Sequence, residues 1–100
     1  MERLFVYGTL MEPKVQQEIF GRITTGTPDH LGGYRRSTIE IDDEIFPTLI
    51  PDQAGVVEGL VLDLTVEELT QADKYETEAY ERVKVQLASK TETWAYRKRT

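Results

Sequence analysis

The stretch that decides the fold is Leu4-Phe5-Val6-Tyr7-Gly8-Thr9-Leu10, an apolar run closed by a glycine turn. Its first four residues contain no polar break, which predicts a strand buried on both faces. Gly8 ends the strand, because glycine turns the chain or lets other atoms approach the backbone at low cost. Pro13 follows shortly afterwards and favours a turn over a longer strand. We therefore expect a central strand with a tight turn at its end.

The turn at Gly8 and Thr9 has two interpretations. A turn that directly follows a central strand exposes several backbone N–H groups in a small concavity, which suits an anion. An ordinary turn without a ligand is the more usual interpretation of such residues. This stretch leaves both interpretations open, and the second half of the chain has to decide between them.

The composition is typical of a small acidic domain. The chain has 100 residues, 39% hydrophobic and 30% charged, so we expect one domain over residues 1–100 with a single core. No apolar run approaches the roughly 20 residues of a membrane-spanning helix, and residues 1–4 lack the layout of a signal peptide. Because the chain has no cysteine, disulfides and thiolate chemistry are excluded and a cytoplasmic location is expected. The formal net charge of −6 disfavours nucleic acid as a partner.

Patterning along the chain predicts strands interrupted by two helices. The helices are expected over residues 13–20 and from Thr65 to about Tyr75 or Glu76, where Thr65-Val66-Glu67-Glu68 matches a capping box. Strand signals occur at residues 23–25, 34–41, 45–50, 56–64, 80–87 and 93–97, and turn signals at 27–29, 42–44, 51–55 and 89–91. These patterns predict an α+β fold, a small mixed β-barrel-like sheet with one capped helix and a short N-terminal helix.

Glu76 has an unusual position on its helix. Leu69 and Ala72 mark the inward side of a helix that starts at Thr65, and at ~100° per residue Glu76 points about 20° from Leu69. A carboxyl group buried there without a positive partner would have a pKa above its usual ~4.3 and could accept a proton near neutral pH. If the helix frays before its last turn, Glu76 is instead a solvated loop residue. The pattern leaves both possibilities open.

The remaining polar residues fit catalysis less well. Asp73 and Arg82 suit an ordinary surface ion pair, and His30 has no obvious catalytic partner. The acidic residues 42–44 do not have the ligand spacing of an EF-hand. No Ser-His-Asp set, phosphate-binding loop or Cys-His site can be assembled from the sequence. We expect no metal and no cofactor.

Six segments complete the pattern, at residues 6–10, 46–49, 57–61, 69–76, 80–83 and 94–96. In this order and spacing they resemble the gamma-glutamylcyclotransferase-like family, especially its small members similar to gamma-glutamylamine cyclotransferase. The chain departs from that family at two places. Thr77 stands where the family commonly has glycine, so the turn after the helix is expected to differ. Many relatives also continue beyond residue 100, so the pocket is expected to be open on one side.

The resemblance implies an enzyme that releases 5-oxoproline and a free amine from a γ-glutamyl amine or peptide. It implies that Glu76 is the general acid/base, and that the backbone N–H groups of Tyr7, Gly8, Thr9 and Leu10 bind the glutamyl carboxylate. The expected partner is a small molecule with a γ-glutamyl group, without nucleic acid or membrane. Two other functions stay open: non-catalytic binding of a small acidic metabolite in the same pocket, and a structural or partner-binding role. The carboxyl group of Glu76 favours the enzyme, since a binder of anions gains nothing from it.

Overall fold

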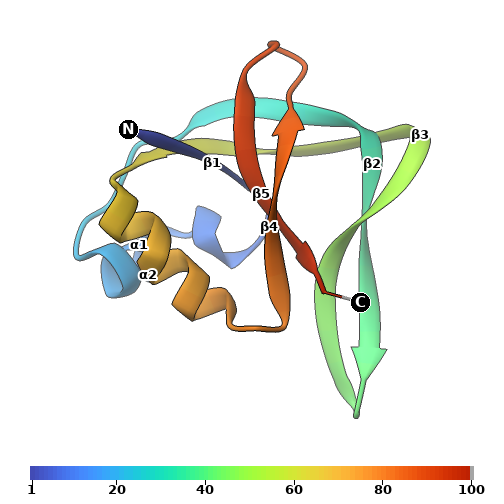
Figure 1. Cartoon of the computed structure of the whole chain (residues 1–100), viewed down its shortest axis with the longest axis horizontal. Coiled ribbons are helices and arrows are strands. Elements are labelled where there is room, and N and C mark those ends of the chain that lie inside the picture. The colour runs from blue at the N-terminus through green and yellow to red at the C-terminus, as the bar shows by residue number, and fades with distance from the viewer. Residues whose placement is uncertain (100) are drawn as a thin grey trace.

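One curled sheet organises residues 1–99, the part of the chain that the structure, a computed structural model, describes (Figure 1). The strands run in the order β2-β3-β1-β5-β4, and β1 pairs antiparallel with β3 but parallel with β5. This five-strand half-barrel with two helices confirms the predicted mixed, barrel-like α+β class. The elements are β1 (Glu2–Val6), the 3-10 helix η1 (Thr9–Met11), α1 (Pro13–Phe20), β2 (Thr27–Ile41), β3 (Glu44–Leu64), α2 (Val66–Glu76), β4 (Tyr80–Gln86) and β5 (Glu92–Lys98).

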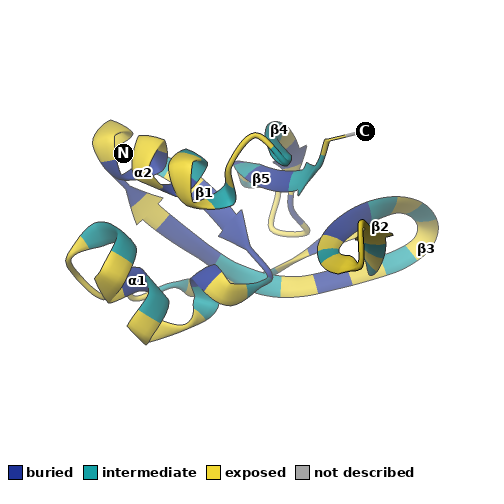
Figure 2. Cartoon of the chain, turned by 90° about the horizontal axis from the view of Figure 1, so that it is seen from below, coloured by how far each residue is buried: buried dark blue, intermediate teal, exposed yellow. Residues whose placement is uncertain are grey.

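Strand β1 lies at the centre of the sheet and is buried on both faces, as its apolar run predicts. Phe5 packs into a core made mainly by side chains of the five strands. Leu4 and Val6 face a second core, which the strands share with α1 and α2 (Figure 2). Because β1 contacts both cores, the position of the turn at its end is fixed relative to both of them. Neither helix in residues 1–99 is long and apolar enough to cross a membrane.

Helix α2 begins at the predicted capping box. The Thr65 side chain accepts the backbone N–H of Glu68 at 3.1 Å, and the Glu68 carboxylate accepts the backbone N–H of Thr65 at 2.9 Å. The helix buries Leu69 and Ala72 and continues through Glu76. Because it does not fray before its last turn, the condition for an inward-pointing Glu76 is met.

Two predictions for the segment after α1 are wrong. Residues 23–25 form no strand; instead, the backbone N–H of Thr24 donates to the buried Gln16 side chain at 3.0 Å. Residues 27–29, expected as a turn, are the first residues of β2 and pair with β3. Pro28 is tolerated there because β2 is an edge strand, where a missing N–H need not break the sheet.

The prediction of a turn at residues 51–55 is also wrong, because these residues form a bulge inside β3. The last four of them lie opposite Gly33 of β2 alone. Gly33 has a φ of 85°, which favours glycine. Gly55 approaches β2 so closely that a Cβ atom there would lie 2.2 Å from the Tyr34 carbonyl oxygen. Such a bulge bends a strand pair, and residues 34–50 form an arm at an angle to the rest of the sheet (Figure 1).

The turn signals at residues 42–44 and 89–91 are confirmed, and both turns close hairpins. Asp42 and Asp43 have φ values of 50° and 65° and form the two-residue turn between β2 and β3. Strands β4 and β5 pair antiparallel from Tyr80 opposite Lys98 to Gln86 opposite Glu92. The first of these turns places the acidic residues 42–44 at the tip of the bent arm.

Candidate active site

The turn after β1 and the end of α2 line the same pocket, which has a volume of about 100 Å³. The structure thus brings together the five residues that the sequence analysis selects. These are Tyr7, Gly8, Thr9, Leu10 and Glu76. The rest of the lining comes from β1, the bent arm and the β4–β5 hairpin, through Phe5, Val6, Arg36, Pro47, Tyr80 and Tyr96.

Hydrogen bonds hold the turn beside the helix. The Thr9 hydroxyl lies 2.7 Å from the Tyr75 hydroxyl, one residue before Glu76. The Leu10 carbonyl accepts the Gln16 side-chain amide at 2.9 Å, and Gln16 is almost fully buried. The Thr9–Tyr75 contact fixes the turn relative to the end of α2, and the Leu10–Gln16 contact fixes it relative to α1.

The turn also has unused backbone donors. Within residues 1–99, the N–H groups of Thr9 and Leu10 donate to no protein acceptor, whereas the N–H of Met11 donates to the Gly8 carbonyl at 3.1 Å. Gly8 itself has a φ of −126°, so this turn does not use the positive φ that favours glycine. A Cβ atom at Gly8 would have no protein atom within 4 Å. The glycine leaves space beside the donors.

Glu76 lies in the pocket without a protein partner. Its carboxyl group makes no ion pair and no hydrogen bond within residues 1–99, and burial raises its pKa to about 7. The cause is that the ionised form loses water without gaining a donor or a positive charge. The expected inward position and raised pKa of Glu76 are therefore present.

Three tyrosines surround this carboxyl group, but their hydroxyls are used elsewhere. Tyr7 donates to the Tyr96 carbonyl, Tyr80 donates to the Pro47 carbonyl at 2.8 Å, and Tyr96 donates to Asp73 at 2.6 Å. Burial, and then the nearby charge of Glu76, raises the pKa of Tyr7 and of Tyr80. The arrangement leaves Glu76 beside polar groups that do not stabilise its charge.

Sequence reasoning missed part of the pocket wall. Arg36 from β2 and Pro47 from β3 reach the pocket because of the bulge in the arm, which the sequence pattern did not predict. Tyr80 and Tyr96 lie in two of the segments that resemble the family, at residues 80–83 and 94–96, but the resemblance assigns them no role. The alternation of β4 could not identify them, because it places Tyr80 on the same face as Arg82 and Lys84, and Tyr96 lies opposite Arg82.

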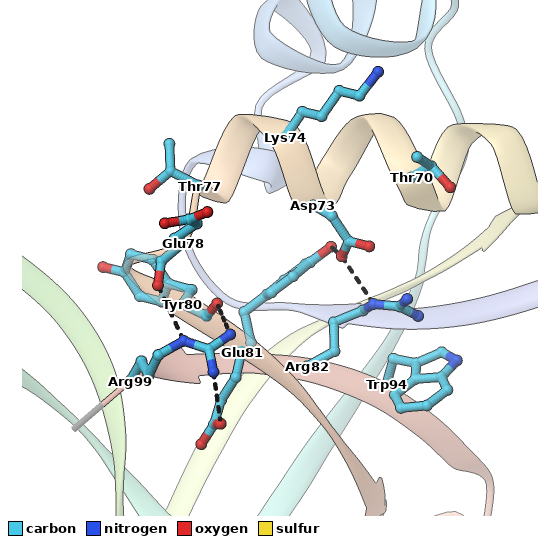
Figure 3. A pocket seen from close by; sticks show the side chains of 11 residues that line it. Thr70, Asp73, Lys74, Thr77, Glu78, Tyr80, Glu81, Arg82, Trp94 and Arg99 are labelled. Carbon is cyan, nitrogen blue, oxygen red and sulfur yellow. Dashed lines mark hydrogen bonds and ion pairs between the residues drawn. The ribbon is translucent and has the colours of Figure 1, made fainter.

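A larger groove, of about 710 Å³, shares Tyr80 and Tyr96 with the pocket but contains neither Glu76 nor the turn (Figure 3). In this groove Arg82 lies 2.8 Å from Asp73, which confirms the predicted ion pair. Glu78, the other glutamate near the end of α2, lines this groove. His30 is exposed on β2, and residues 1–99 contain no cluster of His, Cys, Asp or Glu suited to a metal.

Comparisons with known proteins identify the family of the chain. Residues 4–100 match the family model described as "Gamma-glutamyl cyclotransferase, AIG2-like". AIG2-like protein C of Arabidopsis thaliana is 38% identical over 89 residues, which cover 84% of this chain and 48% of that protein. AIG2-like protein D of the same plant is 33% identical over 106 residues, which cover 95% of this chain and 68% of that protein. The chain spans about half the length of the first of these relatives.

Solved structures show the same fold. The solution structure of an A. thaliana protein has a TM-score of 0.82 at 28% identity, covering 97% of this chain and 61% of that chain. A structure titled gamma-glutamyl cyclotransferase has a TM-score of 0.72 at 15% identity, covering 99% of this chain and 67% of that chain. The second likeness concerns the fold alone. Together with the match over residues 4–100, these findings show that the chain belongs to the AIG2-like gamma-glutamyl cyclotransferase family.

Proposed function

We propose that this protein is a γ-glutamyl cyclotransferase, which converts a γ-glutamyl amine or peptide into 5-oxoproline and a free amine. The observation that carries the proposal is Glu76: a carboxyl group without a partner, with a pKa that burial raises to about 7, in one pocket with the turn after β1. A group with a pKa near the working pH both accepts and returns a proton efficiently.

The reaction needs little besides positioning and one proton carrier. The α-amine of the glutamyl unit attacks its own γ-carbonyl carbon, which forms the C–N bond of a five-membered lactam. The amide bond to the leaving amine then breaks. Glu76 accepts the proton that the α-amine loses and donates it to the leaving amine, so no redox step or cofactor takes part. Holding the substrate in the bent conformation makes the attack intramolecular and supplies much of the acceleration.

The turn supplies a place for the substrate carboxylate. The N–H groups of Thr9 and Leu10 have no protein acceptor within residues 1–99, and the space beside Gly8 allows a ligand to approach the backbone. Since the Thr9–Tyr75 hydrogen bond holds the turn beside the end of α2, a carboxylate bound there leaves the α-amine pointing towards Glu76. The small pocket volume suits a glutamyl head group.

The test is release of 5-oxoproline from a γ-glutamyl amide, measured by chromatography with wild type, Glu76→Gln and Glu78→Gln. Wild type is expected to release it, with kcat/KM falling below an apparent pKa of about 7. Glu76→Gln is expected to lose roughly 10²–10⁴-fold in kcat, the usual range for a lost general base. Glu78→Gln, which changes a carboxyl group outside the pocket, is expected to keep its activity.

Two results would contradict the proposal. Near-normal turnover by folded Glu76→Gln would show that another group carries the proton. Binding of 5-oxoproline by wild type without release of it from any γ-glutamyl amide would identify a binding protein on this fold. Circular dichroism of each variant establishes that it is folded.

A further inference from the structure

Arg36 differs from the other arginines of the chain. Among residues 1–99, each of the other six lies within ion-pair distance of a carboxylate. Arg36 makes no ion pair, and no hydrogen bond to its side chain is found in the same residues. Its neighbour Arg35 lies 3.8 Å from Asp52. An arginine that lines a pocket without a carboxylate partner is available to an anion from outside.

Arg36 lies at the rim of the candidate active site. Three of the residues that line this pocket are exposed, Thr9, Arg36 and Pro47, whereas the other lining residues are buried or half-buried. Arg36 is the charged member of this exposed rim. Its charge also acts on Tyr7, whose hydroxyl lies near Glu76, so the guanidinium is close to the reacting region.

The size of the pocket determines which part of a substrate meets the rim. A volume of about 100 Å³ is far below the roughly 300–1,000 Å³ of sites that enclose drug-sized ligands. A glutamyl head group with its α-amine near Glu76 occupies this space. The group attached to the γ-carbonyl must therefore leave the pocket past the exposed residues, where Arg36 is the charge it encounters.

We propose that Arg36 binds a carboxylate on the leaving part of the substrate and so selects γ-glutamyl amino acids over γ-glutamyl amines that lack a negative charge. This inference rests on the proposed function of the pocket. A planar guanidinium presents two parallel N–H donors to a carboxylate and is always charged, which suits recognition at a solvent-exposed rim.

An alternative role for Arg36 is to bind the α-carboxylate of the glutamyl unit itself. The unused N–H groups of Thr9 and Leu10 already provide donors for that carboxylate. The two roles have different consequences. A residue that binds the α-carboxylate affects every γ-glutamyl substrate equally, whereas a residue that binds the leaving part affects only substrates with a charge there.

The experiment compares γ-glutamyl-alanine with γ-glutamyl-alaninamide, which differ only in the carboxylate of the leaving part. Release of 5-oxoproline is measured for wild type, Arg36→Gln and the control Arg35→Gln. Wild type is expected to prefer the carboxylate substrate by about tenfold in kcat/KM, the lower end for a charge-assisted hydrogen bond because the rim is exposed. Arg36→Gln is expected to lose this preference, and Arg35→Gln to keep it. Added salt is expected to reduce the preference of wild type.

The outcomes separate the inference from the proposed function. Release of 5-oxoproline from both substrates at a ratio that Arg36→Gln leaves unchanged overturns the role of Arg36 while the proposed function stands. Failure to release it from either substrate contradicts the proposed function. In that case the role of Arg36 is tested by calorimetric affinities of wild type and Arg36→Gln for the same two compounds. A preference near tenfold that only Arg36→Gln loses supports the inference, and equal affinities overturn it.

Discussion

Helix α2 carries Glu68 in its first turn and Glu76 at its end, and these two carboxyl groups lie in opposite environments. Glu68, in the first turn, accepts the Arg22 guanidinium at 2.7 and 2.8 Å and the Thr65 backbone N–H at 2.9 Å. The Arg22 hydrogen bonds lower its pKa to about 2. Glu76, the last residue of the helix, has no such partner within residues 1–99, and burial raises its pKa to about 7.

The comparison shows that removal from water does not by itself make a glutamate chemically active. Glu68 exposes little surface, yet its hydrogen bonds keep it ionised and fix the start of the helix. Glu76 is partly covered and unpaired, so its proton is held near neutral pH. One carboxyl group has a structural role, and the other is suited to moving a proton.

The first prediction removes the pairing at the start of the helix. Glu68→Gln is expected to lower the free energy of unfolding by about 1.5 kcal/mol at pH 7, the low end for charged hydrogen bonds, because the Arg22 side chain is 42% exposed. The folded pKa of Glu68 lies below its ordinary 4.5, so the stabilisation is present above pH 4.5 and is lost as the pH falls towards 2.

Urea unfolding of wild type and Glu68→Gln at pH 7 and at pH 3 measures this difference. Glu67→Gln, at the exposed neighbouring position in the same helical turn, is the control and is expected to change stability little. Equal unfolding midpoints for wild type and Glu68→Gln at pH 7 would show that the Arg22 pair does not stabilise the fold.

The second prediction concerns the other end of α2. Thr77 has φ 66° and ψ −176°, a region that is almost restricted to glycine and costs a side-chain residue about 1–3 kcal/mol. Thr77→Gly is expected to raise the free energy of unfolding by roughly 0.5–1 kcal/mol, because glycine's extra flexibility in the unfolded chain offsets part of the gain. Loss of the 3.2 Å hydrogen bond from the Ala79 N–H offsets a further part.

Thermal unfolding of Thr77→Gly beside Thr70→Gly tests this prediction. Thr70 is an exposed interior position of α2, where glycine is expected to destabilise the helix. If both glycine variants are less stable than wild type, then Thr77 is not strained, and its backbone conformation at the end of the helix has another cause.

Local chemistry explains which elements were predictable from the sequence. The apolar run of β1, the proline at the start of α1 and the capping box at Thr65 each act within a few residues. Predictions failed at residues 27–29 and 51–55, where proline and glycine are usual turn signals. There the long pairing of β2 with β3 includes Pro28 in an edge strand and places the extra residues in a bulge. Both effects depend on pairing between distant residues and not on the local sequence.

The same distinction applies to the site. The direction of Glu76 follows from the helical period once the starting residue is known. The position of the turn could also be predicted, because the apolar strand ends at Gly8. Arg36 could not be predicted, because only the bend in the β2–β3 arm brings it to the pocket. Thr77, where the resemblance predicts a turn different from that of the family, adopts a positive φ, which favours glycine.

Helix α2 holds the Glu68 carboxyl group acidic and the Glu76 carboxyl group near neutrality. The direct measurement is a titration of the side-chain carboxyl carbons by NMR on protein labelled at glutamate, with Glu68→Gln and Glu76→Gln used to assign the two signals. We expect Glu76 to titrate with a midpoint of about 7 and Glu68 with a midpoint of about 2. A Glu76 midpoint near 4.5, the ordinary value for a glutamate, would contradict the account.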